Sequence, residues 1–99
     1  KLKKCYTIDE IREIVSEVAK EYGVEKVSLF GSYARGDQDE NSDIDLVIKK
    51  GKIKGFFQFF GFKHKLEERL GKHVDILTYN SLEQSLIKDA LLDEVVLYE

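Results

Sequence analysis

The sequence predicts an α+β fold with a mixed β-sheet flanked by about three or four helices. Three observations support this class. Two Thr/Ser-x-x-Glu/Gln capping signals each precede apolar residues at helical spacing, which is typical of amphipathic helices. Short segments rich in Val, Ile and Leu lie between the helical segments and are typical of strands. Turns rich in Gly, Asn, Asp and Ser separate these segments, since the chain has no Pro.

Two helices are expected after the capping signals. Thr7-Ile8-Asp9-Glu10 has the spacing of a capping box, and the apolar residues that follow predict a helix from about residue 8 to 22. Gly23 is well placed to end this helix. Ser81-Leu82-Glu83-Gln84 repeats the capping signal and predicts a last helix over about residues 82–92.

A third helix is expected over about residues 56–70, with Gly71 at its end. Its first half, Phe56–Phe62, has five phenylalanines in seven residues, more than one helix face can bury. Two interpretations remain open for these rings, which either cover the sheet or stay exposed for a partner.

Four segments are expected to form strands: residues 24–30, 43–48, 73–77 and 95–98. In the first of them Val27 and Leu29 alternate with Lys26, Ser28 and Phe30, which predicts a strand with one face in the core.

Length and charge limit the classes of protein. Ninety-nine residues suit a single domain, here residues 1–99, that folds without stabilising disulfides or metal ions. Charged residues are 35% of the chain and apolar residues 42%, which is a globular composition. Sixteen Lys and Arg against nineteen Asp and Glu give a net charge of −3. The chain as a whole therefore lacks the positive charge that binds a long nucleic acid. A nucleotide or a protein is the expected partner.

Cysteine usage and hydropathy indicate the compartment. The single Cys5 cannot form an internal disulfide and provides no Cys/His cluster for zinc. No apolar run approaches the roughly 20 residues of a membrane span, and no signal-peptide pattern is present. We therefore expect a cytoplasmic protein without a membrane partner.

Three acids stand out because they lie on segments with apolar neighbours. Strand residues alternate between faces, so Asp43 and Asp45 are expected on one face of their strand, and Asp75 lies on a later strand. Buried carboxylates without a cation destabilise a fold or stay protonated. Three of them on adjacent strands therefore point to a hard cation, most simply Mg²⁺.

Gly31-Ser32, at the end of the first predicted strand, is the companion feature. A glycine lets backbone amides approach an anion closely, and the following residues can open a short helix whose amides bind phosphate oxygens. Arg35, in the same stretch, has two open interpretations: it neutralises a phosphate, or it forms a surface ion pair with Asp37 or Asp39.

Taken together, these motifs resemble those of the nucleotidyltransferase superfamily with the DNA polymerase beta-like fold. The signature of that superfamily is Gly-Ser, about ten residues, Asp-x-Asp, and a third acid on a later strand. Here Gly31-Ser32 is followed by ten residues and then by Asp43-Ile44-Asp45, with Asp75 on the later strand. The stretch Gly31–Gly36 and the segment Ser42–Leu46 are most similar to the minimal nucleotidyltransferases, the MNT family of bacteria and archaea.

The resemblance implies a role for each matching residue. Asp43 and Asp45 would hold the metal that bridges a triphosphate, and Asp75 would complete a second metal site or deprotonate the acceptor hydroxyl. Gly31 and Ser32 would grip the triphosphate, and Arg35 could neutralise it. Two Mg²⁺ ions, with ATP as nucleotide donor, would then support in-line displacement of pyrophosphate.

The resemblance also implies a partner and an acceptor. MNT proteins are typically paired with HEPN-family ribonuclease toxins in type VII toxin–antitoxin modules, and can act as antitoxins by adenylylating a tyrosine of the toxin. Two alternatives remain open. One is a non-catalytic antitoxin that masks its HEPN partner, and the other is a nucleotidyltransferase for a small molecule or an RNA end.

Overall fold

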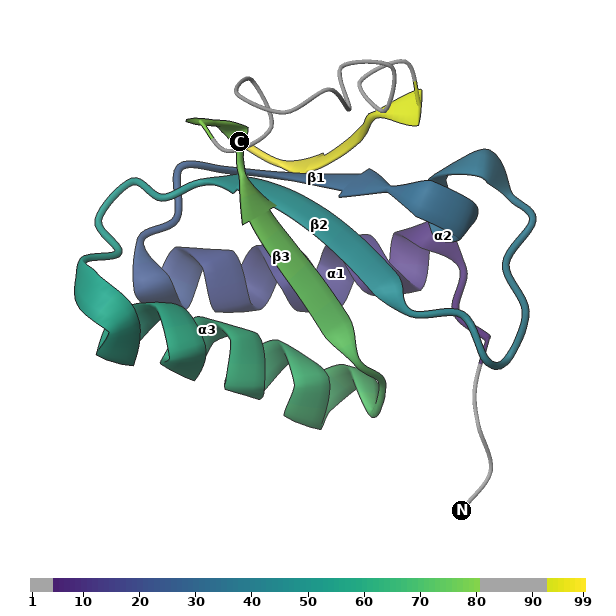
Figure 1. Cartoon of the computed structure of the whole chain (residues 1–99), viewed down its shortest axis with the longest axis horizontal. Helices are drawn as coiled ribbons and strands as arrows, with labels where there is room; N and C mark the ends of the chain where they lie inside the picture. Colours follow the sequence, from purple (N-terminus) through teal and green to yellow (C-terminus); the bar gives the residue numbers. More distant parts are fainter. Residues whose placement is uncertain (1–4, 81–92) are drawn as a thin grey trace.

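The computed structural model describes residues 5–80 and 93–99 (Figure 1). Within these residues it contains three helices: α1 (Ile8–Tyr22), α2 (Gly31–Arg35) and α3 (Gly55–Leu70). It also contains four strands: β1 (Lys26–Phe30), β2 (Ile44–Lys49), β3 (Val74–Thr78) and β4 (Val95–Tyr98). None of these helices is both long and apolar enough to cross a membrane.

The strands form one mixed sheet in the order β3-β2-β1-β4. β1 is antiparallel to both β2 and β4, whereas β2 and β3 are parallel. Helices α1 and α3 lie side by side against one face of this sheet (Figure 1). The predicted α+β class, with a mixed sheet flanked by about three or four helices, is therefore confirmed.

Helix α1 has the ends that the sequence predicted. The Thr7 hydroxyl accepts the Glu10 N–H at 3.1 Å, and the Glu10 carboxylate accepts the Thr7 N–H at 2.9 Å, which completes the capping box. Gly23 ends the helix in the left-handed conformation with φ of +71°. One face of the helix packs on the core through residues that include Ile11, Val15 and Val18.

The core lies between the two long helices and the sheet. Its fully buried side chains include, from the helices, Ile11, Val15, Phe62, Leu66 and Leu70, and from the sheet, Val27, Leu29, Ile44, Leu46 and Ile48. The alternating strand positions Val27 and Leu29 thus face the helices as expected. Burial of apolar area at this interface is the main term that stabilises the fold.

The strand β1 differs from its prediction in two respects. It begins at Lys26 rather than at residue 24, because the Val24 N–H bonds to the Ala19 carbonyl at 3.0 Å and closes the end of α1. Ser28 and Phe30 are also buried, so the expectation of a single core-facing side is wrong. Phe30 packs against Val47 in a second, smaller apolar cluster.

The other boundaries shift by one residue. Strand β2 begins after Asp43, because the parallel ladder starts where the Ile44 N–H bonds to the His73 carbonyl at 3.1 Å. Strand β3 runs from Val74 to Thr78, and α3 begins at Gly55. Strand β4 has its predicted bounds. The helix predicted over residues 82–92 lies outside the described residues.

The phenylalanines of α3 divide between the two interpretations. Phe62 is fully buried, and Phe59 packs against the core. Phe56, Phe57 and Phe60 are exposed. The segment therefore supplies two rings to the core and presents three to solvent.

A polar cluster fixes the start of β4 to β1. The Glu94 carboxylate accepts hydrogen bonds from Ser28 Oγ, at 2.6 Å, and from the Tyr79 hydroxyl, and it lies 3.7 Å from Lys26 Nζ. Burial alone would raise the pKa of Glu94, but the hydrogen bonds from Ser28 and Tyr79 and the charge of Lys26 outweigh it and lower that pKa.

Replacing Glu94 with alanine is expected to reduce the free energy of unfolding by about 1–3 kcal/mol, because Ser28 and Tyr79 lose a shared acceptor. A pKa lowered in the folded chain means that this contribution is present at neutral pH and is lost as the pH falls through it. Urea unfolding at two pH values measures both effects. Glu99→Gln is the matched control, since Glu99 lies 4.0 Å from the same lysine but is 67% exposed. An equal loss in both variants would contradict the prediction.

Candidate active site

Two acids lie side by side at the start of the parallel strand pair. Asp45 is the second residue of β2, and its register partners are Phe30 on β1 and Asp75 on β3. Neighbouring residues in register share a face of the sheet, so the two carboxylates point the same way. The strands thus bring together Asp45 and Asp75, which are 30 residues apart in the sequence.

The electrostatics of Asp45 show an excess of negative charge. Burial raises the pKa of the Asp45 carboxyl, and the charges of Asp75 and Asp43, together with a hydrogen bond to Asp75, raise it further. Arg35 acts in the opposite direction and lowers it. Ionised acids at this place need a compensating cation.

Asp43 and Asp75 are grouped with a histidine at the rim of the sheet. Ligand atoms of Asp43, His73 and Asp75 all lie within 4.8 Å of one another. All three residues are exposed, so the expectation of three buried carboxylates is wrong for Asp43 and Asp75. Asp43 precedes its strand, and Asp75 lies on the edge strand β3, whereas Asp45 is partly buried. Carboxylates open to solvent fit a cation such as Mg²⁺, which keeps several waters and binds few protein ligands.

His73 and Glu67 were not anticipated from the sequence. The His73 ring contacts Asp75 Oδ1 through Nε2 at 2.9 Å and Glu67 Oε2 through Nδ1 at 3.0 Å. Glu67 also accepts the Val74 N–H at 3.0 Å. The signal for His73 was present, since it lies two residues before Asp75 and so on the same side of the chain. Glu67, at the end of α3, carried no comparable signal.

Gly31 connects β1 to α2 directly beside Asp45. Its φ is +71°, in the left-handed region, and a Cβ built on it would lie 2.3 Å from Asp45 Oδ2. Both the backbone conformation and the space therefore require glycine at this position. The predicted turn and short helix at Gly31-Ser32 are confirmed, since α2 begins at Gly31.

The short helix α2 ends at Gly36, where the Ser32 carbonyl accepts the N–H groups of Gly36 at 2.9 Å and of Asp37 at 3.1 Å. Arg35 Nε lies 3.3 Å from Asp37 Oδ2, so the ion pair with Asp37 is confirmed. The pair with Asp39 is not formed, because the Asp39 carboxylate accepts the Asn41 N–H at 2.8 Å instead.

A pocket of about 230 Å³ opens beside the acids, between the loop that follows α2 and the start of β3. It is lined by Glu40, Asn41, Ser42, Asp43, Gly71, Lys72 and His73. Lys72 Nζ donates to the Glu40 carbonyl at 2.7 Å and so ties this loop to the β3 side. Of the three candidate acids, Asp43 lines this pocket, which is open to solvent.

Replacing Asp45 with asparagine is expected to raise the melting temperature of the metal-free chain by a few degrees at neutral pH. The folded-state pKa of Asp45 is raised, so the wild-type free energy of unfolding falls as the pH rises from about 4, the ordinary aspartate value, through the folded pKa. The variant lacks this fall. Melting in EDTA across that pH range is the measurement, with the exposed Glu13→Gln as control. A variant less stable than wild type throughout would contradict it.

Comparison with known proteins identifies a family and several relatives. Residues 8–98 match the nucleotidyltransferase domain family. A candidate protein adenylyltransferase of Methanocaldococcus jannaschii is 45% identical over 89 residues, which cover 90% of this chain and 95% of that relative. The protein adenylyltransferase MntA of Thermococcus cleftensis is 32% identical over 93 residues, which cover 90% of this chain and 94% of MntA.

Two solved structures share the fold. A candidate minimal nucleotidyltransferase superposes with a TM-score of 0.74 at 29% identity, covering 91% of this chain and 95% of the other. A chain from the complex of tri-AMPylated Shewanella oneidensis HEPN toxin with MNT antitoxin superposes with a TM-score of 0.68 at 17% identity, covering 92% and 71%. Because the family match spans nearly the whole sequence, and the relatives align over almost their full lengths, this chain belongs to the nucleotidyltransferase domain family and is a minimal nucleotidyltransferase.

Proposed function

We propose that this nucleotidyltransferase is an Mg²⁺-dependent protein adenylyltransferase that moves AMP from ATP to a tyrosine hydroxyl of a HEPN-family toxin and so acts as its antitoxin. The observation that carries the proposal is the convergence of Asp43, Asp45 and Asp75 beside Gly31. Two relatives that bear the name protein adenylyltransferase, and the shared fold of an MNT antitoxin, support it.

The positions of these residues support a donor side of the reaction. Asp43 and Asp45 would hold Mg²⁺, and Asp75 would either complete a second metal site or deprotonate the acceptor hydroxyl. When bound, Mg²⁺ supplies positive charge that offsets the triphosphate and the departing pyrophosphate. The turn at Gly31 and Ser32 would offer backbone amides to the phosphates, and Arg35, at the end of the same short helix, would add a guanidinium.

The acceptor side follows from exposure. The Asp75 side chain is 54% exposed on an edge strand, so a hydroxyl of a large acceptor can reach it from solvent. The tyrosine oxygen forms a bond to the α-phosphorus, the bond from that phosphorus to the pyrophosphate oxygen breaks, and Asp75 accepts the tyrosine proton. His73 would help to orient Asp75 through its 2.9 Å contact.

Incubation with labelled ATP, Mg²⁺ and a HEPN-family toxin tests the proposal. Label is expected on one or more tyrosines of the toxin, located by peptide mass spectrometry, and replacement of those tyrosines with phenylalanine is expected to remove it. Asp43→Ala and Asp45→Ala should each abolish labelling. Transfer that survives both changes would contradict the assigned site.

A second candidate function is masking of the toxin without catalysis. The exposed rings of Phe56, Phe57 and Phe60 favour it, because such a surface is typical of a protein interface. Cells that express the toxin separate the two functions. Protection by an Asp43→Ala, Asp45→Ala double variant favours masking, and loss of protection favours adenylylation.

A further inference from the structure

The first turns of α3 expose three aromatic rings that we call the aromatic patch. Its residues are Phe56, Phe57 and Phe60, which are 79%, 98% and 57% exposed. The rings of Phe56 and Phe60 stack with their centroids 6.0 Å apart, so two of the three form a continuous surface. α3 is already anchored to the core by Phe62, Leu66 and Leu70. The patch therefore has no part in fixing the helix and leaves a large apolar area in water.

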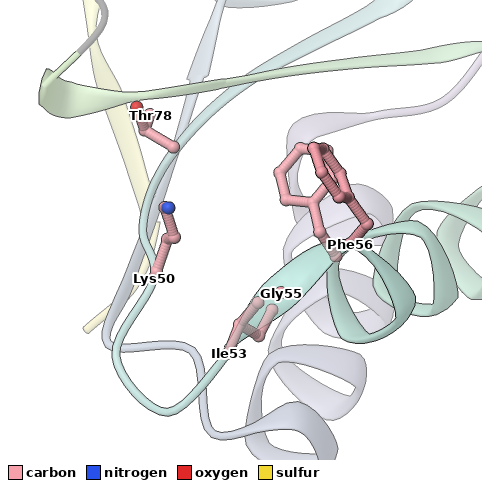
Figure 2. A pocket seen from close by; sticks show the side chains of 6 residues that line it. Lys50, Ile53, Gly55, Phe56 and Thr78 are labelled. Atoms are coloured by element: carbon pink, nitrogen blue, oxygen red, sulfur yellow. The ribbon is translucent and has the colours of Figure 1, made fainter.

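A pocket opens at the edge of the aromatic patch (Figure 2). It has a volume of about 270 Å³ and is lined by Lys50, Ile53, Gly55, Phe56, Phe59 and Thr78. Figure 2 shows the Phe56 ring on one side of the pocket, with Lys50 and Thr78 facing it across the gap. The volume is below the roughly 300–1,000 Å³ of small-molecule sites. It suits one inserted side chain better than a nucleotide.

The charge around the patch has one sign. Residues 47–66 contain six lysines and neither Asp nor Glu, although the whole chain has a net charge of −3. Lys50, Lys52 and Lys54 are exposed and immediately precede the patch. Among the described residues, none of these three lysines forms an ion pair with an acid. An apolar surface with an uncompensated basic rim complements a surface that is apolar and acidic.

The patch lies away from the acids of the active site. Thr78 is paired with Ile48 at the far end of the β2–β3 ladder, whereas Asp45 is paired with Asp75 near its start. Three residues of strand separate these pairs, or about 10 Å at the usual rise per residue. A partner held at the patch would therefore leave the carboxylates open.

We propose that the aromatic patch and its pocket form a docking site for an acidic amphipathic segment of a protein partner. One large apolar side chain of that segment enters the pocket, and its carboxylates face Lys50, Lys52 and Lys54. This is the groove mode by which apolar anchors on one face of a peptide bind a protein. The proposal rests on the proposed function only in taking the partner to be a protein, since it concerns where that partner is held and not the chemistry.

Other polyanionic partners fit less well. A single-stranded nucleic acid binds rings that are free to stack with bases, but two of the three rings here, Phe56 and Phe60, are already stacked on each other. An anionic membrane would contact the tips of the rings and leave the pocket empty, because lipid surfaces offer no side chain to insert. The concave pocket therefore favours a peptide.

Selection from a displayed library of random peptides tests the proposal on the full chain. Peptides recovered on wild type are expected to combine a large apolar residue with flanking Asp or Glu. Measured by fluorescence anisotropy, their affinity should fall at least about tenfold in a Phe56→Ser, Phe57→Ser, Phe60→Ser variant and in a Lys50→Glu, Lys52→Glu, Lys54→Glu variant. Circular dichroism checks that both variants fold, which is expected because every replaced side chain is exposed.

The matched control is Leu77→Ser, which removes an apolar side chain that is 47% exposed elsewhere on the surface and should leave peptide affinity unchanged. Asp45→Asn should also leave peptide affinity unchanged, although it should reduce transfer. Peptide binding and transfer are therefore measured separately, so a failure of the chemical assignment can be told from a failure of the docking site. The proposal is overturned if recovered peptides are basic or bind the serine variant equally well. Patch-dependent binding to phosphatidylserine vesicles or to oligoadenylate, or patch-dependent dimerisation in sedimentation, without acidic peptides, also overturns it.

Discussion

Asp45→Asn is expected to lower the rate of AMP transfer at least about 10³-fold, which corresponds to about 4 kcal/mol of transition-state stabilisation. Asn keeps the shape of the side chain but removes a charge that interacts with both Asp75 and Asp43. A carboxylate that positions a divalent cation acts mainly where charge develops on the leaving group, so the loss should fall on kcat more than on binding of the acceptor. Initial rates at saturating ATP and Mg²⁺ give the measurement.

The control for this change is Glu40→Gln, which removes one negative charge from the loop that leads to Asp43. Glu40→Gln should change the rate by no more than a few-fold, because Asp45 is expected to act as a specific ligand and not through the total negative charge of the surface. Equal losses in the two variants would mean that the field of the surface, and not a specific ligand, controls the rate.

Gly31→Ala is expected to abolish most of the transfer activity, at least about 10²-fold, and to reduce the free energy of unfolding by about 1–2 kcal/mol or more. The added Cβ would lie 2.3 Å from Asp45 Oδ2, so either the carboxylate or the turn must move. Chemical denaturation and initial-rate measurements on the same preparation separate the two effects.

Gly36→Ala provides a matched comparison at the other end of the same helix. Gly36 has a φ of +83°, but nothing lies within 4 Å of a Cβ placed there. It should show the backbone penalty alone, about 1 kcal/mol, with transfer reduced by no more than about twofold. If Gly36→Ala reduces transfer as much as Gly31→Ala does, the close approach to Asp45 is not the cause.

Local signals in the sequence predicted most of the fold. The Thr7 capping box and the positions of Gly23 and Gly71 place the helix ends correctly, because each depends on contacts within a few residues. The sequence also placed Asp45 and Asp75 on adjacent strands, and the structure adds that the two residues are register partners. Family resemblance added the roles proposed for these residues.

Features that depend on distant contacts were beyond the sequence pattern. Asp43 was expected inside its strand, but the strand begins only where the parallel ladder with His73 begins. Alternation along β1 did not reveal that Phe30 is buried, because its cover comes from Val47 and other residues far along the chain. Glu67 reaches His73 only because α3 packs beside the start of β3. The separation of exposed from buried phenylalanines required the position of α3 on the sheet.

The parallel pairing of β2 and β3 has a consequence for folding. Parallel neighbours need a crossover, and here α3 supplies it, so the contact between Asp75 and Asp45 spans the whole of that helix in sequence. The acids are therefore assembled by a long-range contact that forms late relative to local helices. Hydrogen exchange at β3 should follow the opening of α3, and partial loss of that helix would separate the carboxylates while β1 and β2 stay paired. The distance between the carboxylates of the active site thus depends on the packing of α3 on the opposite face of the sheet.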